Sequence, residues 1–285
     1  MSLDAKNKTG LCEWVYLLDT YKHIAFNVRA DRPRSDGYFT PIQDRAHGYR
    51  HVVICEPHPC QLENWNVEFL KQYDSCVTYN KSFIEKHKHE LNLHLMYGHP
   101  AANNYYVLDS HLSYEEKIKG VCFINRGYPL RVKVLNELNV EPYLVKHVFS
   151  KEPWGDVHYR GFQGGGIPSS CDTLALINKY LFRVCFEYTY DPFYANGFVT
   201  ERITDCFKAK TIPIYLGCSN IEEFVPRELF VDYRDFNFDN AALSDYLLSF
   251  PKSKYIDMVD AAYEWVKTCR IGNIDDLEVI LRGLK

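Results

Sequence analysis

Residues 200–202, Thr-Glu-Arg, combine a hydroxyl, a carboxylate and a guanidinium at the predicted start of a helix. Thr200 is a favourable N-cap, and the apolar residues that follow it recur at helical spacing. The N–H groups and the positive end of a helix dipole attract anions, and Arg202 could grip a phosphate through two hydrogen bonds. A solvent-exposed first turn would show the same residues, so the spacing alone leaves both interpretations open.

A second basic group follows the apolar run of residues 120–125. Arg126, Tyr128 and Arg131 stand where a predicted strand gives way to a helix. An arginine in such a loop, beside a helix N-terminus, is suited to holding a pyrophosphate. Surface arginines at the start of an ordinary helix would give the same pattern.

Two carboxylates also come directly after apolar runs. Glu56 follows the run His-Val-Val-Ile-Cys and precedes a Pro-His-Pro turn. This rigid turn makes Glu56 a candidate general base, with His58 as a competitor, although an ordinary polar residue at a strand end is the simpler alternative. Glu187 ends a segment in which apolar side chains alternate with more polar ones. The alternation predicts a strand with one packed face and with Glu187 at its carboxyl end.

The elements that would position these side chains alternate between strands and helices. Residues 181–233 show the pattern of strand, polar loop, helix, buried strand, glycine, short helix and strand, a βαβ unit with its loops on one edge. The apolar run of residues 211–216 is typical of a parallel strand covered on both faces. Ligands of an open α/β sheet bind outside the carboxyl ends of its strands, so the sequence predicts an anion-binding crevice there.

The whole chain continues this alternation, which predicts an α/β fold with two Rossmann-like halves and a helical tail. Strands are expected near residues 14–18, 24–28, 51–55, 75–79, 93–97, 120–125, 143–148, 181–187 and 211–216. Helices are expected over residues 64–73, 83–91, 129–138, 171–180, 240–249, 253–269 and 274–284, and after Thr200. Irregular segments are expected over residues 29–50 and 150–170. The predicted domains are residues 1–112 and 113–270, and residues 271–285 form a C-terminal helix that could return to the first domain.

Composition and charge exclude several classes of partner. A net charge of −4 and a pI near 6.3 provide no basic surface for nucleic acid or for an anionic membrane. The polar N-terminus lacks a signal-peptide core, and no apolar run reaches the length of a transmembrane span. The ten cysteines form no C-x-x-C pair, which favours a reducing compartment without excluding disulfides. We therefore expect a soluble, cytoplasmic protein.

The sequence contains no motif of a cofactor or metal site. No G-x-G-x-x-G opens a helix, so a nucleotide-dependent oxidoreductase is disfavoured, and the glycine triplet at 164–166 favours a flexible loop. No D-x-D element ends a strand, and Asp232, Asp235 and Asp239 suit turns and helix caps. We expect no obligatory metal and no other cofactor.

The densest of these motifs resemble a known family. FRVCFEYT, FVTERITDCFKAKTIPIYLGCSNIEEFVP and FVDYRDF are similar to the donor-binding signature of the family 10 α-1,3/4-fucosyltransferases, especially the soluble bacterial and viral members. In that family a Phe-Glu-Asn ends the strand, a Tyr-x-Thr-Glu-Lys opens the helix, and a Pro-x-x-x-Gly strand follows. FINRGYPLR and LMYGHP resemble two further segments of the family more loosely.

The resemblance implies a GT-B fold, in which two Rossmann-like domains face a cleft. It also implies an inverting, metal-independent glycosyltransferase that moves L-fucose from GDP-fucose to a hydroxyl of an oligosaccharide or glycoconjugate acceptor. By their places in the motifs, Arg131 and Arg202 would hold the donor pyrophosphate, and Glu201 would bind ribose or sugar hydroxyls. Glu187 would support the site, and Glu56 would deprotonate the acceptor hydroxyl.

Three positions depart from the family pattern. Tyr188 replaces an Asn, Phe198 replaces a Tyr, and Arg202 replaces a Lys. Arg202 keeps the positive charge, so phosphate binding is expected to survive. Tyr188 and Phe198 would contact the sugar and the base, so a UDP- or GDP-linked pentose or deoxyhexose is an alternative donor. A non-catalytic module that binds a glycan or a nucleotide is a third interpretation.

Overall fold

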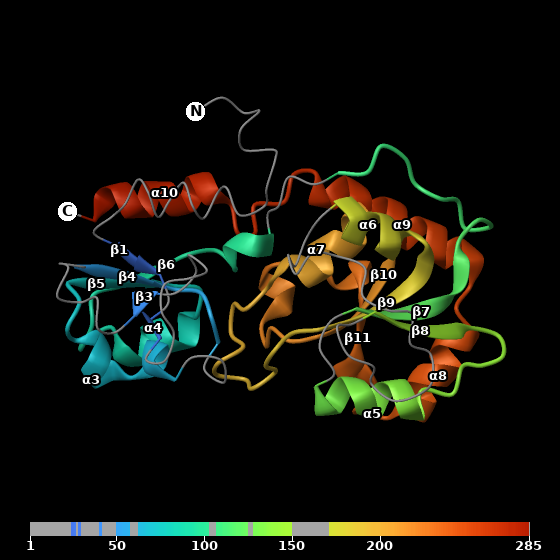
Figure 1. The fold of residues 1–285 in the computed structure, drawn as a ribbon, viewed down its shortest axis with the longest axis horizontal. Helices are drawn as coiled ribbons and strands as arrows, with labels where there is room; N and C mark the ends of the chain where they lie inside the picture. The colour runs from blue at the N-terminus through green and yellow to red at the C-terminus, as the bar shows by residue number, and fades with distance from the viewer. Residues whose placement is uncertain are drawn as a thin grey trace.

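The computed structural model of the chain describes residues 24–26, 28–29, 40–41, 50–57, 62–102, 107–124, 128–149 and 171–284. These residues form two parallel sheets, each with helices packed against it (Figure 1). We call the first sheet with its helices the N-terminal unit and the second the C-terminal unit. The predicted α/β fold class is confirmed. The strand predicted near residues 14–18 and the irregular segment 150–170 lie outside the described residues.

The N-terminal unit is built on a parallel sheet with the strand order β1-β4-β5-β6. Its strands are β1 (Ile24–Phe26), β4 (His51–Ile54), β5 (Ser75–Thr78) and β6 (Leu93–Leu95). Two short helices follow β4 and β5, namely α3 (Val67–Leu70) and α4 (Lys81–His87). A separate ladder pairs β2 (Val28–Arg29) with β3 (Thr40–Pro41), and β3 lies in a segment that the sequence predicts as loop.

The C-terminal unit is a second parallel sheet, with the strand order β11-β10-β9-β7-β8. Its strands are β7 (Ile118–Ile124), β8 (Val145–Phe149), β9 (Tyr180–Phe186), β10 (Ile212–Leu216) and β11 (Val231–Asp232). The helices from here to the C-terminus are α5 (Pro129–Glu137), α6 (Cys171–Asn178), α7 (Glu201–Lys208), α8 (Asn240–Leu248), α9 (Lys252–Val266) and α10 (Ile274–Gly283). Helices α6, α7 and α9 cover one face of this sheet, and α5 and α8 cover the other (Figure 1). Short 3-10 helices are η2 (Glu63–Trp65), η3 (Pro100–Ala102), η4 (Ile221–Glu223), η5 (Arg227–Leu229) and η6 (Tyr233–Phe236).

Strand β9 is more deeply buried than its sequence indicates. All seven of its residues are buried. Alternate side chains pack with α5 and α8 on one face, whereas Cys185 packs with Ile203 and Phe207 of α7 on the other. The prediction of one packed face was wrong, because α7 covers the face that carries Arg183 and Cys185. Arg183 is 2% exposed and donates to the backbone carbonyl of Arg202 at 3.2 Å.

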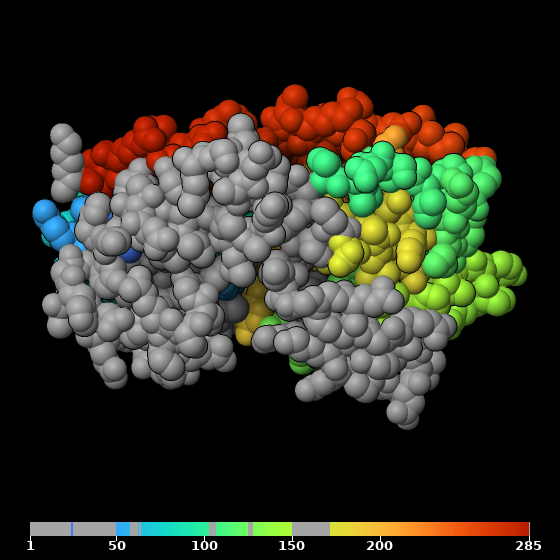
Figure 2. Space-filling model, turned by 45° about the horizontal axis from the view of Figure 1, so that its top comes forward, coloured from blue at the N-terminus to red at the C-terminus, as the bar shows by residue number. Residues whose placement is uncertain are grey.

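Helix α10 packs against the N-terminal unit although it ends the chain. Its residues Ile274, Leu277 and Leu281 belong to the same buried cluster as β4 and β5. Figure 1 shows α10 over the first sheet and α9 over the second, and Figure 2 shows both as one band along an edge of the molecule. The chain returns through Gly272 at φ 67°, where an added Cβ would lie 2.2 Å from the His99 carbonyl oxygen. The C-terminal segment therefore ties the two units together.

The carboxyl edges of the two sheets face each other. Tyr79, directly after β5, packs on Phe198, which follows β9, with ring centroids 5.1 Å apart. Asn80 donates from its side chain to the backbone carbonyl of Phe193 at 2.6 Å. Ligand sites of parallel sheets lie at the carboxyl edges of the strands, so a ligand-binding site is expected where the two units meet.

Candidate functional site

Glu187, directly after β9, lies at the centre of the candidate site. Its carboxylate accepts hydrogen bonds from the Thr200 N–H at 3.0 Å and from Thr200 Oγ1 at 2.9 Å. The Arg202 guanidinium donates to Glu187 Oε2 at 2.8 Å, and the two side chains are 19% exposed for Arg202 and 0% for Glu187. Burial raises the pKa of Glu187, and the positive charge of Arg202 opposes that rise. Glu187 therefore holds the residues that begin α7.

The first turn of α7 takes its conformation from Thr200. The backbone of Thr200 is extended, and its Oγ1 accepts from the Arg202 N–H at 3.4 Å, which confirms the predicted N-cap. Burial lowers the pKa of Arg202, but the charges of Glu187 and Glu201 outweigh it and raise the pKa. The buried Nε of Arg202 has no hydrogen-bond partner within the described residues. A charged guanidinium with an unused donor thus lies at the positive end of a helix.

Arg131 brings a second guanidinium to the same place. It lies in the first turn of α5, is 4% exposed, and donates from Nη2 to the backbone carbonyls of Phe186 and Glu187. Its guanidinium also stacks on the Tyr128 ring, 4.9 Å from the centroid. Burial lowers the pKa of Arg131 to about 9, and the nearby Arg202 charge adds to this effect. Two cations that repel each other across a strand end favour a bound anion, which would relieve that repulsion.

Glu201 is the acidic residue of this turn. It is 6% exposed, and within the described part of the chain its carboxylate takes part in no hydrogen bond or salt bridge. His99, from the segment after β6, is buried beside it: burial lowers the pKa of His99 to about 4, and the Glu201 charge works against that shift. His99 is thus neutral near pH 7. The sequence places His99 in the loosely matching LMYGHP segment, and only the fold brings it to Glu201.

Gly217, the residue after β10, makes room for the Glu187 side chain. A Cβ built on Gly217 would lie 2.3 Å from Glu187 Cγ and 2.8 Å from the hydroxyl of Tyr215. Contacts this short do not occur between real atoms, so a larger residue would displace Glu187. A glycine directly after a strand often marks a place where another group lies close to the backbone. The sequence pattern shows such a glycine at position 217, but it does not indicate that the neighbouring group is Glu187.

The two aromatic residues that depart from the family pattern differ in position. Tyr188 is half-buried, and its ring meets that of Tyr128 edge to face with centroids 4.9 Å apart, next to Arg131. Phe198 is 3% exposed and packs between the units, with its ring 5.1 Å from Tyr79. Tyr188 therefore lies next to Tyr128, on which Arg131 stacks. Tyr188 also packs against the buried cluster of the N-terminal unit, to which Phe198 belongs.

Glu56 follows β4 on the edge of the N-terminal unit that faces α7. It is half-buried, and its backbone carbonyl accepts from Trp65 Nε1 at 3.2 Å. Burial raises the pKa of the neighbouring Cys55 thiol well above its usual value, and the Glu56 charge adds to this effect. Arg126 and His58, the other residues singled out in these two loops, lie outside the described residues.

Other predicted features concern metals and membranes. Asp232 caps η6 and Asp239 caps α8, as the sequence predicts. Among the residues that the structure describes, no three His, Cys, Asp or Glu side chains gather in a way that could hold a metal ion. Over the same residues, none of the helices combines the length and the apolar character needed to cross a membrane.

Comparison with protein families bears on the segment that contains most of this site. Residues 147–279 match the family model described as "Glycosyltransferase family 10 (fucosyltransferase) C-term". The resemblance drawn from the motifs is thereby confirmed for the segment that holds Glu187, Glu201 and Arg202. The chain is also similar to the alpha-(1,3)-fucosyltransferase FucT of Helicobacter pylori, at 40% identity over 87 residues, which are 29% of this chain and 17% of that protein.

Solved structures share the fold over most of the chain. A crystal structure of an alpha1,3-fucosyltransferase aligns with a TM-score of 0.53 over 93% of this chain and 79% of that chain, at 16% identity. The DNA-modifying enzyme beta-glucosyltransferase aligns with a TM-score of 0.51 over 96% of this chain and 94% of that chain, at 12% identity. At these identities the likeness shows the fold alone, and that fold is GT-B, as expected from the sequence.

Proposed function

We propose that the protein is an inverting glycosyltransferase that transfers L-fucose from GDP-fucose to a hydroxyl of a glycan acceptor. The observation that carries the proposal is the pair of guanidinium groups, Arg131 and Arg202, at the carboxyl edge of the second sheet. Both are held in place by Glu187 or its backbone, and Arg202 Nε has no hydrogen-bond partner among the residues that the structure describes. The family 10 match over residues 147–279 supports fucose as the sugar.

In this mechanism the chain supplies binding, orientation and charge. Arg131, Arg202 and the helix dipole of α7 would bind the pyrophosphate and stabilise the negative charge that grows on it as the bond to the sugar breaks. Glu201, in the first turn of α7, would accept hydrogen bonds from ribose or sugar hydroxyls. These cations perform the task that a divalent metal performs in other transferases, so we also propose that no metal is required.

Glu56 is the proposed general base. Its carboxylate would take the proton of the acceptor hydroxyl while that oxygen attacks the anomeric carbon from the side opposite GDP. The bond between the anomeric carbon and the phosphate oxygen breaks, its electron pair leaves with GDP, and the anomeric configuration inverts. The position of Glu56 after β4, on the edge that faces α7, supports this role.

A related donor is the second candidate, and Tyr188 favours it. The bulky ring of Tyr188 borders Arg131 and Tyr128, where the family pattern has the smaller Asn. A pentose or another deoxyhexose linked to GDP or UDP would fit such a change. The fold does not choose among donors, because GT-B structures of the same likeness include a glucosyltransferase.

The test begins with thermal-shift measurements in the presence of EDTA. GDP and GDP-fucose should raise the melting temperature, and UDP and UDP-sugars should not. The reverse preference would overturn the fucose assignment. Equal stabilisation with and without EDTA is expected, and a requirement for a divalent metal would contradict the metal-independent mechanism.

Catalysis is tested by GDP release from GDP-fucose in the presence of glycan acceptors. Glu56→Gln should retain GDP binding and lose transfer by a factor of about 10²–10⁴, the usual contribution of a general base. Transfer at the wild-type rate by Glu56→Gln would remove Glu56 from the mechanism. Binding without any GDP release in the wild type would favour the non-catalytic module.

We also propose a reducing, cytoplasmic setting. Seven cysteines described by the structure carry free thiols, and six of them are buried. The test is to denature the native protein without a reductant and to treat it with an alkylating reagent. Reaction of all ten thiols would support a reducing setting, and a disulfide found under the same conditions would contradict it.

A further inference from the structure

Residues 191–199 form a loop of the C-terminal unit that lies between the two units and leads directly into α7. We call this segment the connecting loop. The C-terminal unit holds it from one side, where Gly197 N–H donates to Asn220 Oδ1 and Ser219 Oγ donates to the carbonyl of Pro192, both at 2.8 Å. The N-terminal unit holds it from the other side. The conformation of the α7 start therefore depends on both units.

Asn80 is the buried polar link between the connecting loop and the N-terminal unit. Its Oδ1 accepts from the Phe83 N–H at 2.7 Å and so caps α4. Its Nδ2 donates to the Phe193 carbonyl at 2.6 Å, across 113 residues of sequence. The residue is 0% exposed, so neither bond can be replaced by water without rearrangement. The side-chain amide of Asn80 thus bonds to both units. Its oxygen caps helix α4 of the N-terminal unit, and its nitrogen donates to the connecting loop.

The surrounding contacts are close and add support of their own. The His99 N–H donates to the Val199 carbonyl oxygen at 3.0 Å, and the Trp65 ring meets the Tyr194 ring with centroids 5.5 Å apart. Asn196 Oδ1 accepts from the Ser82 N–H at 3.3 Å, near the limit for a hydrogen bond. Gly197, at φ 77°, approaches the N-terminal unit so closely that an added Cβ would lie 2.2 Å from the Tyr79 carbonyl oxygen. The loop and the first unit therefore fit together tightly, and the bond from Asn80 is the shortest polar contact between them within the described residues.

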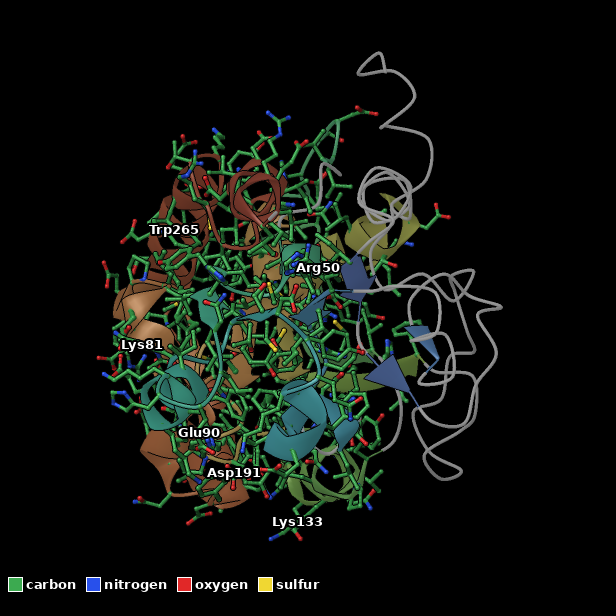
Figure 3. The ribbon with its side chains drawn as sticks, turned by 90° about the vertical axis from the view of Figure 1, so that its left-hand side faces the viewer. Arg50, Lys81, Glu90, Lys133, Asp191 and Trp265 are labelled. Atoms are coloured by element: carbon green, nitrogen blue, oxygen red, sulfur yellow. The ribbon has the colours of Figure 1, made fainter. Side chains whose placement is uncertain are left out.

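A salt bridge nearby contributes less. Lys81 and Glu223 pair across the units at 3.1 Å, but their side chains are 55% and 53% exposed. Lys81 lies at the outer surface of the molecule in Figure 3. An exposed pair of this kind is screened by solvent and salt, so it does not hold the loop by itself.

We propose that Asn80 is a positioning residue for the donor site. By holding the connecting loop, it keeps the start of α7, and with it Glu201 and Arg202, in the conformation that binds the nucleotide. This inference rests on the proposed function. If the loop kept this conformation in only a tenth of the molecules, the apparent affinity for the nucleotide would fall about tenfold.

Asn80→Asp separates the two bonds of the side chain. Aspartate is as good an N-cap as asparagine, so the bond to Phe83 and helix α4 should persist. It has no N–H to donate, and its carboxylate would face the Phe193 carbonyl oxygen. Calorimetric titration with GDP well below the melting temperature should give a Kd about tenfold above that of the wild type. Amide hydrogen exchange should speed up in residues 191–199 and stay unchanged in α4.

Asn196→Asp is the matched control. It adds the same charge to the contact between the connecting loop and the first unit, on a side chain that is half-buried, and its Oδ1 can still accept from the Ser82 N–H. It should bind GDP like the wild type. An equal loss of affinity in both variants would assign the effect to charge and would overturn the proposal.

Two further results would also overturn it, and they are distinguishable. If Asn80→Asp melts at a lower temperature but binds GDP with wild-type affinity, Asn80 only stabilises the fold, and the proposed function is unaffected. If the wild type itself binds no GDP, the proposed function fails and the positioning role fails with it.

Discussion

Gly217→Ala tests whether the space beside Glu187 sets up the site. The new Cβ would lie 2.3 Å from Glu187 Cγ, whereas two carbon atoms need about 3.5 Å, so the side chain must move by about 1 Å. The carboxylate accepts from Thr200 and Arg202 at 2.8 to 3.0 Å, and a shift of that size would break these hydrogen bonds. Gly217 does not have a positive φ, so the substitution adds this clash without backbone strain.

The magnitude follows from what Glu187 would lose. Breaking a buried ion pair costs about 3–5 kcal/mol, and we take the lower end because the Arg202 side chain is 19% exposed and can regain water. Alanine offsets about 0.4–1 kcal/mol by restricting the unfolded chain. The free energy of unfolding should therefore fall by about 2–3 kcal/mol, which lowers the melting temperature by roughly 4–12 °C. We expect the displaced Arg202 guanidinium to lose at least about 1.4 kcal/mol of binding free energy toward GDP. This loss corresponds to a GDP affinity that is about tenfold lower.

The assay is urea denaturation together with calorimetric titration of GDP. Gly283→Ala is the matched control, because the Cβ that it adds meets no other element of the described chain within 4 Å. In the last turn of α10 this change should be neutral or stabilise by up to about 1 kcal/mol. If Gly217→Ala kept both the unfolding free energy and the GDP affinity of the wild type, the packing of Glu187 against Gly217 would not be what organises the site.

Three further predictions concern single residues of the site. In calorimetric titrations, Arg202→Lys should keep part of the GDP affinity, and Arg202→Ala should bind GDP about tenfold more weakly than Arg202→Lys. Equal GDP affinity in the two variants would show that the charge at this position is unimportant. Arg131→Met keeps an apolar stem but removes the cation, so GDP should bind at least about tenfold more weakly while UV absorbance melting still shows a folded protein, and unchanged affinity would remove Arg131 from the site. For His99, the folded pKa of about 4 lies below the ordinary 6.5, so the folded state binds fewer protons than the unfolded state between these values and stability is lost as the pH falls through them. In urea denaturation the free energy of unfolding of the wild type should fall by up to about 3 kcal/mol between pH 7 and 4 because of His99. His99→Gln should lack this contribution to the fall. An identical pH dependence in the variant would show that the burial of His99 does not cause it.

Features set by neighbouring residues were predictable from the sequence. The N-cap of α7 at Thr200 and the caps at Asp232 and Asp239 follow from side chains that bond to N–H groups two or three residues away. The parallel strand β10 follows from its unbroken apolar run. The strand and helix order of both units follows from the same local patterns.

Features set by distant residues were not predictable. Alternation in β9 predicted one packed face, but α7 covers the other face and buries Arg183. The bond between Asn80 and Phe193 spans 113 residues, and no local spacing indicates it. His99 reaches Glu201 only because the carboxyl edges of two sheets face each other. Hydrophobic periodicity reports which side of an element is apolar, and it does not report what packs there.

Nucleotide binding is tested most directly by a calorimetric titration of the wild-type protein with GDP and with UDP in the presence of EDTA. We expect one GDP per chain, weaker or absent binding of UDP, and loss of GDP binding when Arg131 and Arg202 are both replaced by alanine. Binding of UDP in preference to GDP, or GDP binding that survives the double replacement, would contradict this expectation.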